Sequence, residues 1–163
     1  MGNRIISFDQ NKAWVNGNEF FGLVEEGSVE AKRKMLDYDG FALPAGVKVP
    51  GGKLEPMTAK LKAKVNDPLV LKEFNRNRGF VQLKLKGRAT VYASTQGVVE
   101  DQDVSTRING FLEEVPTPDY KNGNEISNME LTIHVHFLEV AVNGAVVLKV
   151  DTTSGEVVPR DLI

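Results

Sequence analysis

The longest alternation of apolar and polar positions spans residues 125–151. Its apolar side chains recur at every second position in two runs: Leu131, Ile133, Val135 and Phe137, then Val146, Leu148 and Val150. This period is that of strands with one buried face. Asn143-Gly144 separates the runs and is typical of a type I′ turn, so the pattern predicts one long hairpin. Its first arm, 127–142, far exceeds the usual strand length of about 5–6 residues, and such a strand either crosses between sheets or reaches a neighbouring chain.

Weaker alternation elsewhere predicts a mostly β chain. Asn16-Gly17 separates Ala13-Trp14-Val15 from the apolar run at 20–24, which indicates a second hairpin after a polar start. Further strands are expected at 25–39, 53–65, 80–86, 88–95 and 105–115. A short helix is expected over 67–79, because Asp67 can cap it, Pro68 suits its first position and Gly79 can end it. About seven strands and one short helix indicate a single domain over 1–163, built as two packed antiparallel sheets or a β-barrel.

Residues 40–52 interrupt this pattern with four glycines and two prolines. Such a composition opposes both a helix and a central strand, so it predicts a long loop. Loops of about a dozen residues or more are uncommon in compact domains and usually have a function.

Composition narrows the class of protein. The chain has no cysteine, which excludes disulfides and thiolate metal sites. Its opening lacks the apolar core of a signal peptide, and no apolar run approaches the roughly 18 residues of a membrane span, so we expect a soluble protein. The formal net charge of -2 gives no field that favours wrapping by nucleic acid.

Candidate chemistry is sparse. His134 and His136 lie two apart on one predicted strand and share a face, as two zinc ligands could, but no cysteine or well-spaced carboxylate completes a site. Paired carboxylates such as Glu25-Glu26 lack a neighbouring histidine or nucleophile for acid–base work. The run GVKVPGGKL has Leu54 where a phosphate-binding loop needs serine or threonine. We therefore expect no catalytic, cofactor or metal residues.

The order of motifs goes further than their chemistry. The segments VNGNEFFG, RKMLDYDGFALPAGV and HVHFLEVAVNGAVVLKVDTTSGEV together resemble the major tail tube protein of contractile-tailed bacteriophages and phage-tail-like bacteriocins. The last segment is the most specific, with an aromatic-rich strand, an Asn-Gly turn, an apolar strand and then Asp151. The likeness covers about residues 11–157. The chain departs from it in its short polar C-terminus, where many relatives continue into a helical tail.

This resemblance implies a structural protein without enzymatic activity. It implies hexameric rings that stack into a tube, with strands of neighbouring subunits joining into a continuous β-barrel around a channel for DNA. The implied partners are other copies of the chain, a surrounding sheath protein, and baseplate, tape measure and tail terminator proteins. The implied location is the virion tail, assembled in the cytoplasm of the host bacterium.

Two sets of residues become hypotheses under this reading. The ring-stacking loop would use the apolar residues of 40–52: Phe41, Leu43, Pro44, Val47, Val49 and Pro50. The channel would be lined by carboxylates that do not hold phosphate: Glu100, Asp101, Asp103, Glu113 and Glu114. The inner tube of a bacteriocin or contractile injection system is the nearest alternative. A monomeric β-barrel that binds a sugar or peptide is less favoured because no pocket-forming cluster is evident, and an enzyme is the least favoured reading.

Overall fold

The computed structural model describes residues 4–16, 18–19, 22–40, 42, 44–65, 70–117 and 127–163, and in these it is mostly β. The strands are β1 (Arg4–Val15), β2 (Asn18–Glu19), β3 (Gly22–Glu30), β4 (Arg33–Tyr38), β5 (Val47–Leu54), β6 (Met57–Val65), β7 (Phe80–Ala93), β8 (Gly97–Leu112), β9 (Ser127–Val142), β10 (Ala145–Asp151) and β11 (Val157–Val158). One helix, α1 (Val70–Phe74), is followed by a 3-10 turn at Arg76–Gly79. Within these residues, no helix has the length and apolar character to span a membrane.

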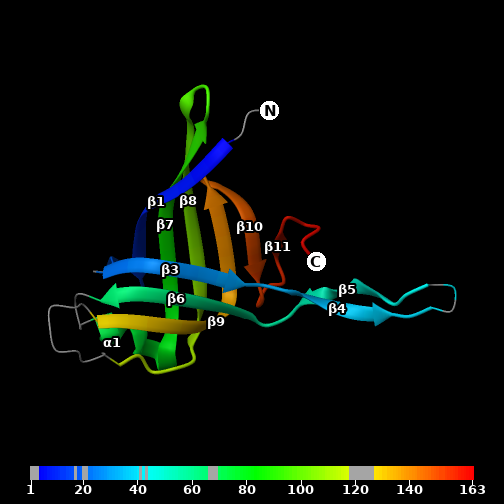
Figure 1. The fold of residues 1–163 in the computed structure, drawn as a ribbon. Helices are drawn as coiled ribbons and strands as arrows, with labels where there is room; N and C mark the ends of the chain where they lie inside the picture. Colours follow the sequence, from blue (N-terminus) through cyan, green and yellow to red (C-terminus); the bar gives the residue numbers. More distant parts are fainter. Residues whose placement is uncertain are drawn as a thin grey trace.

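The strands form two crossed layers that share β9. One layer has the antiparallel order β11-β10-β9-β8-β7-β1-β2, and the other is β3-β6 joined to the first half of β9. Residues 127–135 of β9 pair with β6, whereas its residues 137–142 pair with β10. In Figure 1, β3 and β6 run across the front of β7 and β8. The long strand therefore crosses between sheets, which is one of the two outcomes that its length predicts.

The hydrophobic core lies between these layers. Its buried side chains come from the inward positions of both layers and from α1: Ala13, Val15, Met57, Ala59, Leu61, Phe74, Val81, Leu83, Ile108, Met129, Leu131, Ile133, Val135, Leu138 and Val150. The alternation along β9 is clear, since Met129, Leu131, Ile133 and Val135 are buried and the residues between them are not. The predicted apolar face packs at Leu131, Ile133, Val135 and Val150. The prediction is wrong at Phe137 and Val146, because the register with β8 shifts at His136, so that Leu138 is buried in place of Phe137, and because Val146 is 41% exposed.

The helix is shorter than the sequence predicts. Its described part is only Val70–Phe74, and it anchors to the core through Phe74. The chain does not continue as an α-helix to Gly79, because Asn77 and Arg78 in the 3-10 turn adopt left-handed φ angles of 50° and 59°. The expected cap and first residue, Asp67 and Pro68, lie outside the described residues.

Several predicted strand bounds are also wrong. The two strands expected at 80–86 and 88–95 are one strand, β7, which ends at Ala93. The strand expected at 105–115 begins at Gly97 and ends at Leu112. The start of the chain, expected to be polar and without a strand, includes the first residues of β1. The second predicted hairpin is short: β2 pairs with β1 at only two positions, and the following strand, β3, pairs with β6. Residues 25–39 divide between β3 and β4, which lie in different sheets. Gly17, Phe20 and Phe21 of the second predicted hairpin lie outside the described residues.

The Asn143-Gly144 turn forms as the sequence predicts. Both residues have positive φ angles, 52° and 83°, as a type I′ turn requires. Asn143 also joins the turn to β8 through two hydrogen bonds. The Asp103 amide donates to Asn143 Oδ1 at 2.9 Å, and the Asn143 amide donates to the Asp103 carbonyl at 2.8 Å. The end of the hairpin is therefore locked to its neighbour.

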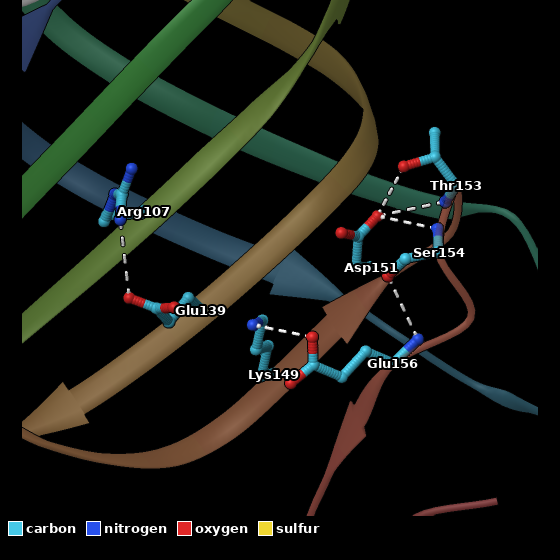
Figure 2. Close-up of polar contacts among 7 residues, drawn as sticks. All are labelled: Arg107, Glu139, Lys149, Asp151, Thr153, Ser154 and Glu156. Atoms are coloured by element: carbon cyan, nitrogen blue, oxygen red, sulfur yellow. Dashed lines mark hydrogen bonds and ion pairs between the residues drawn. The ribbon is translucent and has the colours of Figure 1, made fainter.

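Asp151 caps the turn that follows β10 (Figure 2). Its carboxylate accepts hydrogen bonds from the Thr153 amide at 3.0 Å, the Thr153 hydroxyl at 2.7 Å and the Ser154 amide at 3.3 Å. The hydrogen bonds from Thr153, followed by those from Ser154, lower the pKa of Asp151 to about 2. The turn leads into β11, which Lys149 and Glu156 support with an ion pair of 3.1 Å.

The Asp151 cap should make the fold sensitive to acid. Its folded-state pKa lies below the value of about 3.9 for an unfolded chain, so the ionised carboxylate stabilises the fold above pH 4. That contribution is lost as the pH falls through about 2. We expect Asp151→Asn to lower the thermal midpoint at pH 6 and to approach wild type near pH 2. A deficit that stays constant from pH 6 to pH 2 would contradict this role.

Candidate assembly surfaces

Strands β4 and β5 form a separate two-stranded ribbon. They pair antiparallel with each other and with no other described strand. Figure 1 shows the ribbon extending away from the two crossed layers. Every residue of β4 is exposed, as is all of β5 except Leu54. An isolated hairpin of this kind is marginally stable in water, so the ribbon needs a packing partner to be well ordered.

The two faces of the ribbon differ in character. Leu36 lies opposite Val49, and Tyr38 lies opposite Val47, so these four side chains share one face. They are 50%, 40%, 60% and 45% exposed in that order. We call these four residues the apolar ribbon face. The opposite face carries Asp37 across from Lys48 and is polar there.

The base of the ribbon is fixed to the body. Arg33 Nε donates to the Leu162 carbonyl at 2.8 Å, which ties the start of β4 to the C-terminal segment. The Glu55 amide donates to the Lys32 carbonyl at 2.8 Å, which joins the two segments that connect the ribbon to β3 and β6. The ribbon is thus held at one end and free along its length.

The ribbon corrects the predicted loop at 40–52. Val47–Leu54 is a strand, and only the connection before Val47 is irregular. A two-stranded ribbon has no central strand, so Pro50 and the glycines are tolerated in it. Of the predicted stacking residues, Val47, Val49 and Pro50 lie on β5, and Pro44 is exposed in the turn. Phe41 and Leu43 lie outside the described residues.

Sequence reasoning missed the β4 half of this surface. Leu36 and Tyr38 are the exposed apolar residues that β4 contributes to it, and the exposed Met35 lies on the opposite face with Asp37. The available signal was the alternation of Leu36 and Tyr38 with Asp37 and Asp39, immediately before a turn and the alternating valines of 47–49.

The predicted channel carboxylates fall into two separate groups. Glu100, Asp101 and Asp103 lie near the start of β8, whereas Glu113 and Glu114 follow its end. Asp103 and Leu112 are separated by about 30 Å of extended strand, at roughly 3.3 Å per residue. All five carboxylates are exposed. Their orientation toward a channel remains a prediction.

Each group has its own electrostatic setting. Asp101 pairs with Arg88 across the β7–β8 ladder, and the hydrogen bond from Arg88 holds the pKa of Asp101 below its usual range. Glu113 Oε1 lies 3.5 Å from His134 Nε2, so a protonated histidine would offset its charge. A wall of five unpaired carboxylates is therefore not what the subunit presents.

The two histidines have separate neighbours. His134 faces Glu113, whereas the ring of His136 packs edge-on against Phe111 with centroids 5.3 Å apart. Phe111 in turn meets Phe80 at 5.1 Å. In the part of the chain that the structure describes, no group of three histidines, carboxylates or cysteines could hold a metal ion.

Open strand edges complete the assembly features. Among the described strands, β3 pairs on one side only, with β6. The outer edge of β1 is paired with β2 at only two positions, Trp14 and Val15. Unpaired backbone groups on such edges are ready to pair with another chain. A hollow of about 580 Å³ lies beside β3, lined in part by Ser28, Lys60 and Glu130.

Comparison with known proteins fits this architecture. A family model for the phage tail tube protein FII matches residues 7–157. No curated protein was found to match the sequence. Among solved structures, one similar chain comes from a cryo-EM structure of the extracellular contractile injection system PVC, in its sheath-tube complex in the extended state. The two chains are 13% identical over 81% of this chain and 88% of that one, with a TM-score of 0.52.

The protein is therefore a crossed-sheet β protein with an exposed two-stranded arm. It belongs to the phage tail tube protein FII family. The resemblance seen in the sequence is confirmed, and the family is one of structural tail components.

Proposed function

We propose that this chain is the tube subunit of a contractile tail, and that it forms hexameric rings which stack into a hollow conduit for DNA. The family match over 7–157 carries this proposal. The open edge of β3 supports it, because pairing of edges around a ring removes unpaired backbone groups. The ribbon supports the stacking, because an exposed apolar face at the end of an extended arm is suited to contact a second copy in the next ring.

The surroundings of such a tube follow from the same assignment. The similar solved chain comes from a sheath-tube complex, which supports a sheath protein around this tube as well. Baseplate, tape measure and tail terminator proteins would define its two ends and its length. Assembly would occur in the cytoplasm of the host bacterium. The near-balanced charge, with 20 basic and 22 acidic residues, suits a wall that DNA passes without being held.

A second candidate keeps the architecture and changes the cargo. The likeness to a chain of an extracellular contractile injection system favours a tube that carries effector proteins, and a bacteriocin tube is a related option. Each of these is a structural role without catalysis.

Electron microscopy of the purified, concentrated protein tests the assembly directly. We expect hollow tubes with a regular axial repeat and six-fold symmetry in cross-section. A reconstruction should place the apolar ribbon face against the neighbouring ring and some of the carboxylates toward the channel: Glu100, Asp101, Asp103, Glu113 and Glu114. Rings of another symmetry would overturn the hexamer, and a channel that none of the five carboxylates faces would overturn the channel assignment.

A further inference from the structure

A cluster of cations surrounds Trp14 on the outer face of the β1-β7-β8 layer. Lys12 lies opposite Lys86 in the β1–β7 register, and Trp14 lies opposite Lys84. Lys84 is in turn opposite Arg107 in the β7–β8 register. Trp14 is half-buried, and the Lys84 ammonium sits 5.8 Å from its ring centroid. We call Lys12, Trp14, Lys84, Lys86 and Arg107 the cationic surface.

The arrangement is unfavourable for an isolated subunit. Lys12 with Lys86, and Lys84 with Arg107, are like charges directly opposite each other on adjacent strands, and such pairs destabilise a sheet. Two such pairs lie in neighbouring rows of one face. An anionic partner that covers the face would relieve the repulsion between these side chains and would stabilise the subunit.

Nearby carboxylates neutralise the arginines more than the lysines. Arg107 lies 3.7 Å from Glu139 (Figure 2), and Arg88 pairs with Asp101. Among the described residues, Lys12, Lys84 and Lys86 are in no ion pair. Asp103 also borders the surface, and Asp9 and Glu19 lie opposite Arg88 and Trp14 in the backbone register. Among the side chains that the structure describes, the three lysines are therefore the exposed cations of this face without a carboxylate partner.

Two hollows in the cationic surface lie on either side of Trp14. One, of about 390 Å³, is lined by Trp14, Gln82, Leu83, Lys84, Arg107 and Asn109. The other, of about 280 Å³, is lined by Lys12, Trp14, Lys86, Gly87, Arg88 and Asp103. A partner chain that crosses the strands here can place side chains on both sides of the indole.

We propose that the cationic surface binds an extended acidic segment of another protein. Neighbouring strands place its cations about 5 Å apart, and alternate residues along β7 place them roughly 7 Å apart, which is the side-chain repeat of an extended chain. Nucleic acid fits less well, because a base stacks on an open aromatic face and Trp14 is half-buried with the Lys84 ammonium over its ring. The proposal rests on the proposed function in one respect: a protein that surrounds the tube would supply this segment. Asp101 and Asp103 lie on the same face of β8 as Arg107, so these two carboxylates would then face outward, and only the other predicted carboxylates could line the channel.

A labelled peptide of ten glutamates tests the chemistry. At low salt, we expect it to bind the subunit by fluorescence anisotropy and to change the emission of Trp14, the only tryptophan in the chain. Lys84→Gln with Lys86→Gln should weaken binding by about 3- to 30-fold, as the loss of two exposed ion pairs predicts. The matched control, Lys53→Gln with Lys60→Gln, makes the same charge change at exposed lysines outside the surface and should bind as the wild type does.

Several outcomes would overturn the proposal: equal weakening in both double variants, peptide binding that leaves Trp14 emission unchanged, or tighter binding of a duplex DNA oligonucleotide than of the peptide. Exclusion of the peptide once the chain has assembled would also overturn it, because the face would then lie between copies. The titration uses unassembled subunits, so its failure leaves tube formation intact. Absence of tubes in the microscope would count against the proposed function and not against this surface.

Discussion

Replacing Leu36 and Val49 by asparagine should leave a folded subunit that assembles poorly. These residues lie opposite each other on the apolar ribbon face and are 50% and 40% exposed. Covering the exposed part of each in a tube would contribute about half of the 1.5–3 kcal/mol expected for full burial. Together the two substitutions should raise the protein concentration needed for tubes by about 10- to 100-fold. Pelleting of tubes over a concentration series, with circular dichroism of the supernatant, measures this.

The opposite face of the same ribbon supplies a matched control. Asp37 and Lys48 also lie opposite each other and are exposed, so Asp37→Asn with Lys48→Asn introduces the same residues on the same strands. We expect this variant to assemble close to the wild-type concentration. Equal loss of tubes in both variants would show that asparagine weakens the ribbon itself. Normal tubes from Leu36→Asn with Val49→Asn would exclude the apolar ribbon face as an assembly contact.

The long hairpin was predictable because its information is local. Alternation along β9 up to Val135 marks the buried face, and Asn143-Gly144 selects the turn, so neither feature needs knowledge of distant residues. The strands that pair with β9 could not be predicted in this way. The sequence does not show that one side of β9 meets β6 over 127–135 and β10 over 137–142, because that division depends on how the two layers cross.

The candidate site was only half predictable for a similar reason. Glycine and proline at 40–52 indicate a break in regular structure, yet β5 tolerates them because a ribbon has only edge strands. Its partner β4 was assigned to the preceding strand, so Leu36 and Tyr38 went unnoticed. The five predicted channel carboxylates were grouped by their charge alone, and extended backbone places them near the two ends of a long strand, β8. The length of β8, more than the type of residue, therefore determines how far apart the carboxylates lie.

Gly110→Ala should destabilise the subunit more than any surface change. Gly110 is buried in β8 at the register shift where β8 pairs with β9. A Cβ there would overlap the His134 carbonyl oxygen, which is a backbone atom that no rotamer change can move. Overpacking of this severity should lower the free energy of unfolding by about 3 kcal/mol or more. We expect the thermal midpoint to fall by roughly 6–12 °C.

Two further variants show whether the backbone contact is the cause. Gly46→Ala is the control, because a Cβ at this exposed position would meet no atom closer than 3.9 Å. Ile133→Ala removes a second obstacle, the Cγ2 atom 2.9 Å from the same Cβ, but leaves the His134 oxygen in place. Ile133→Ala should therefore fail to rescue Gly110→Ala. If Ile133→Ala did rescue Gly110→Ala, crowding by the Ile133 side chain would be the reason that glycine is needed at position 110. The close approach of the β8 and β9 backbones would then be excluded as the reason.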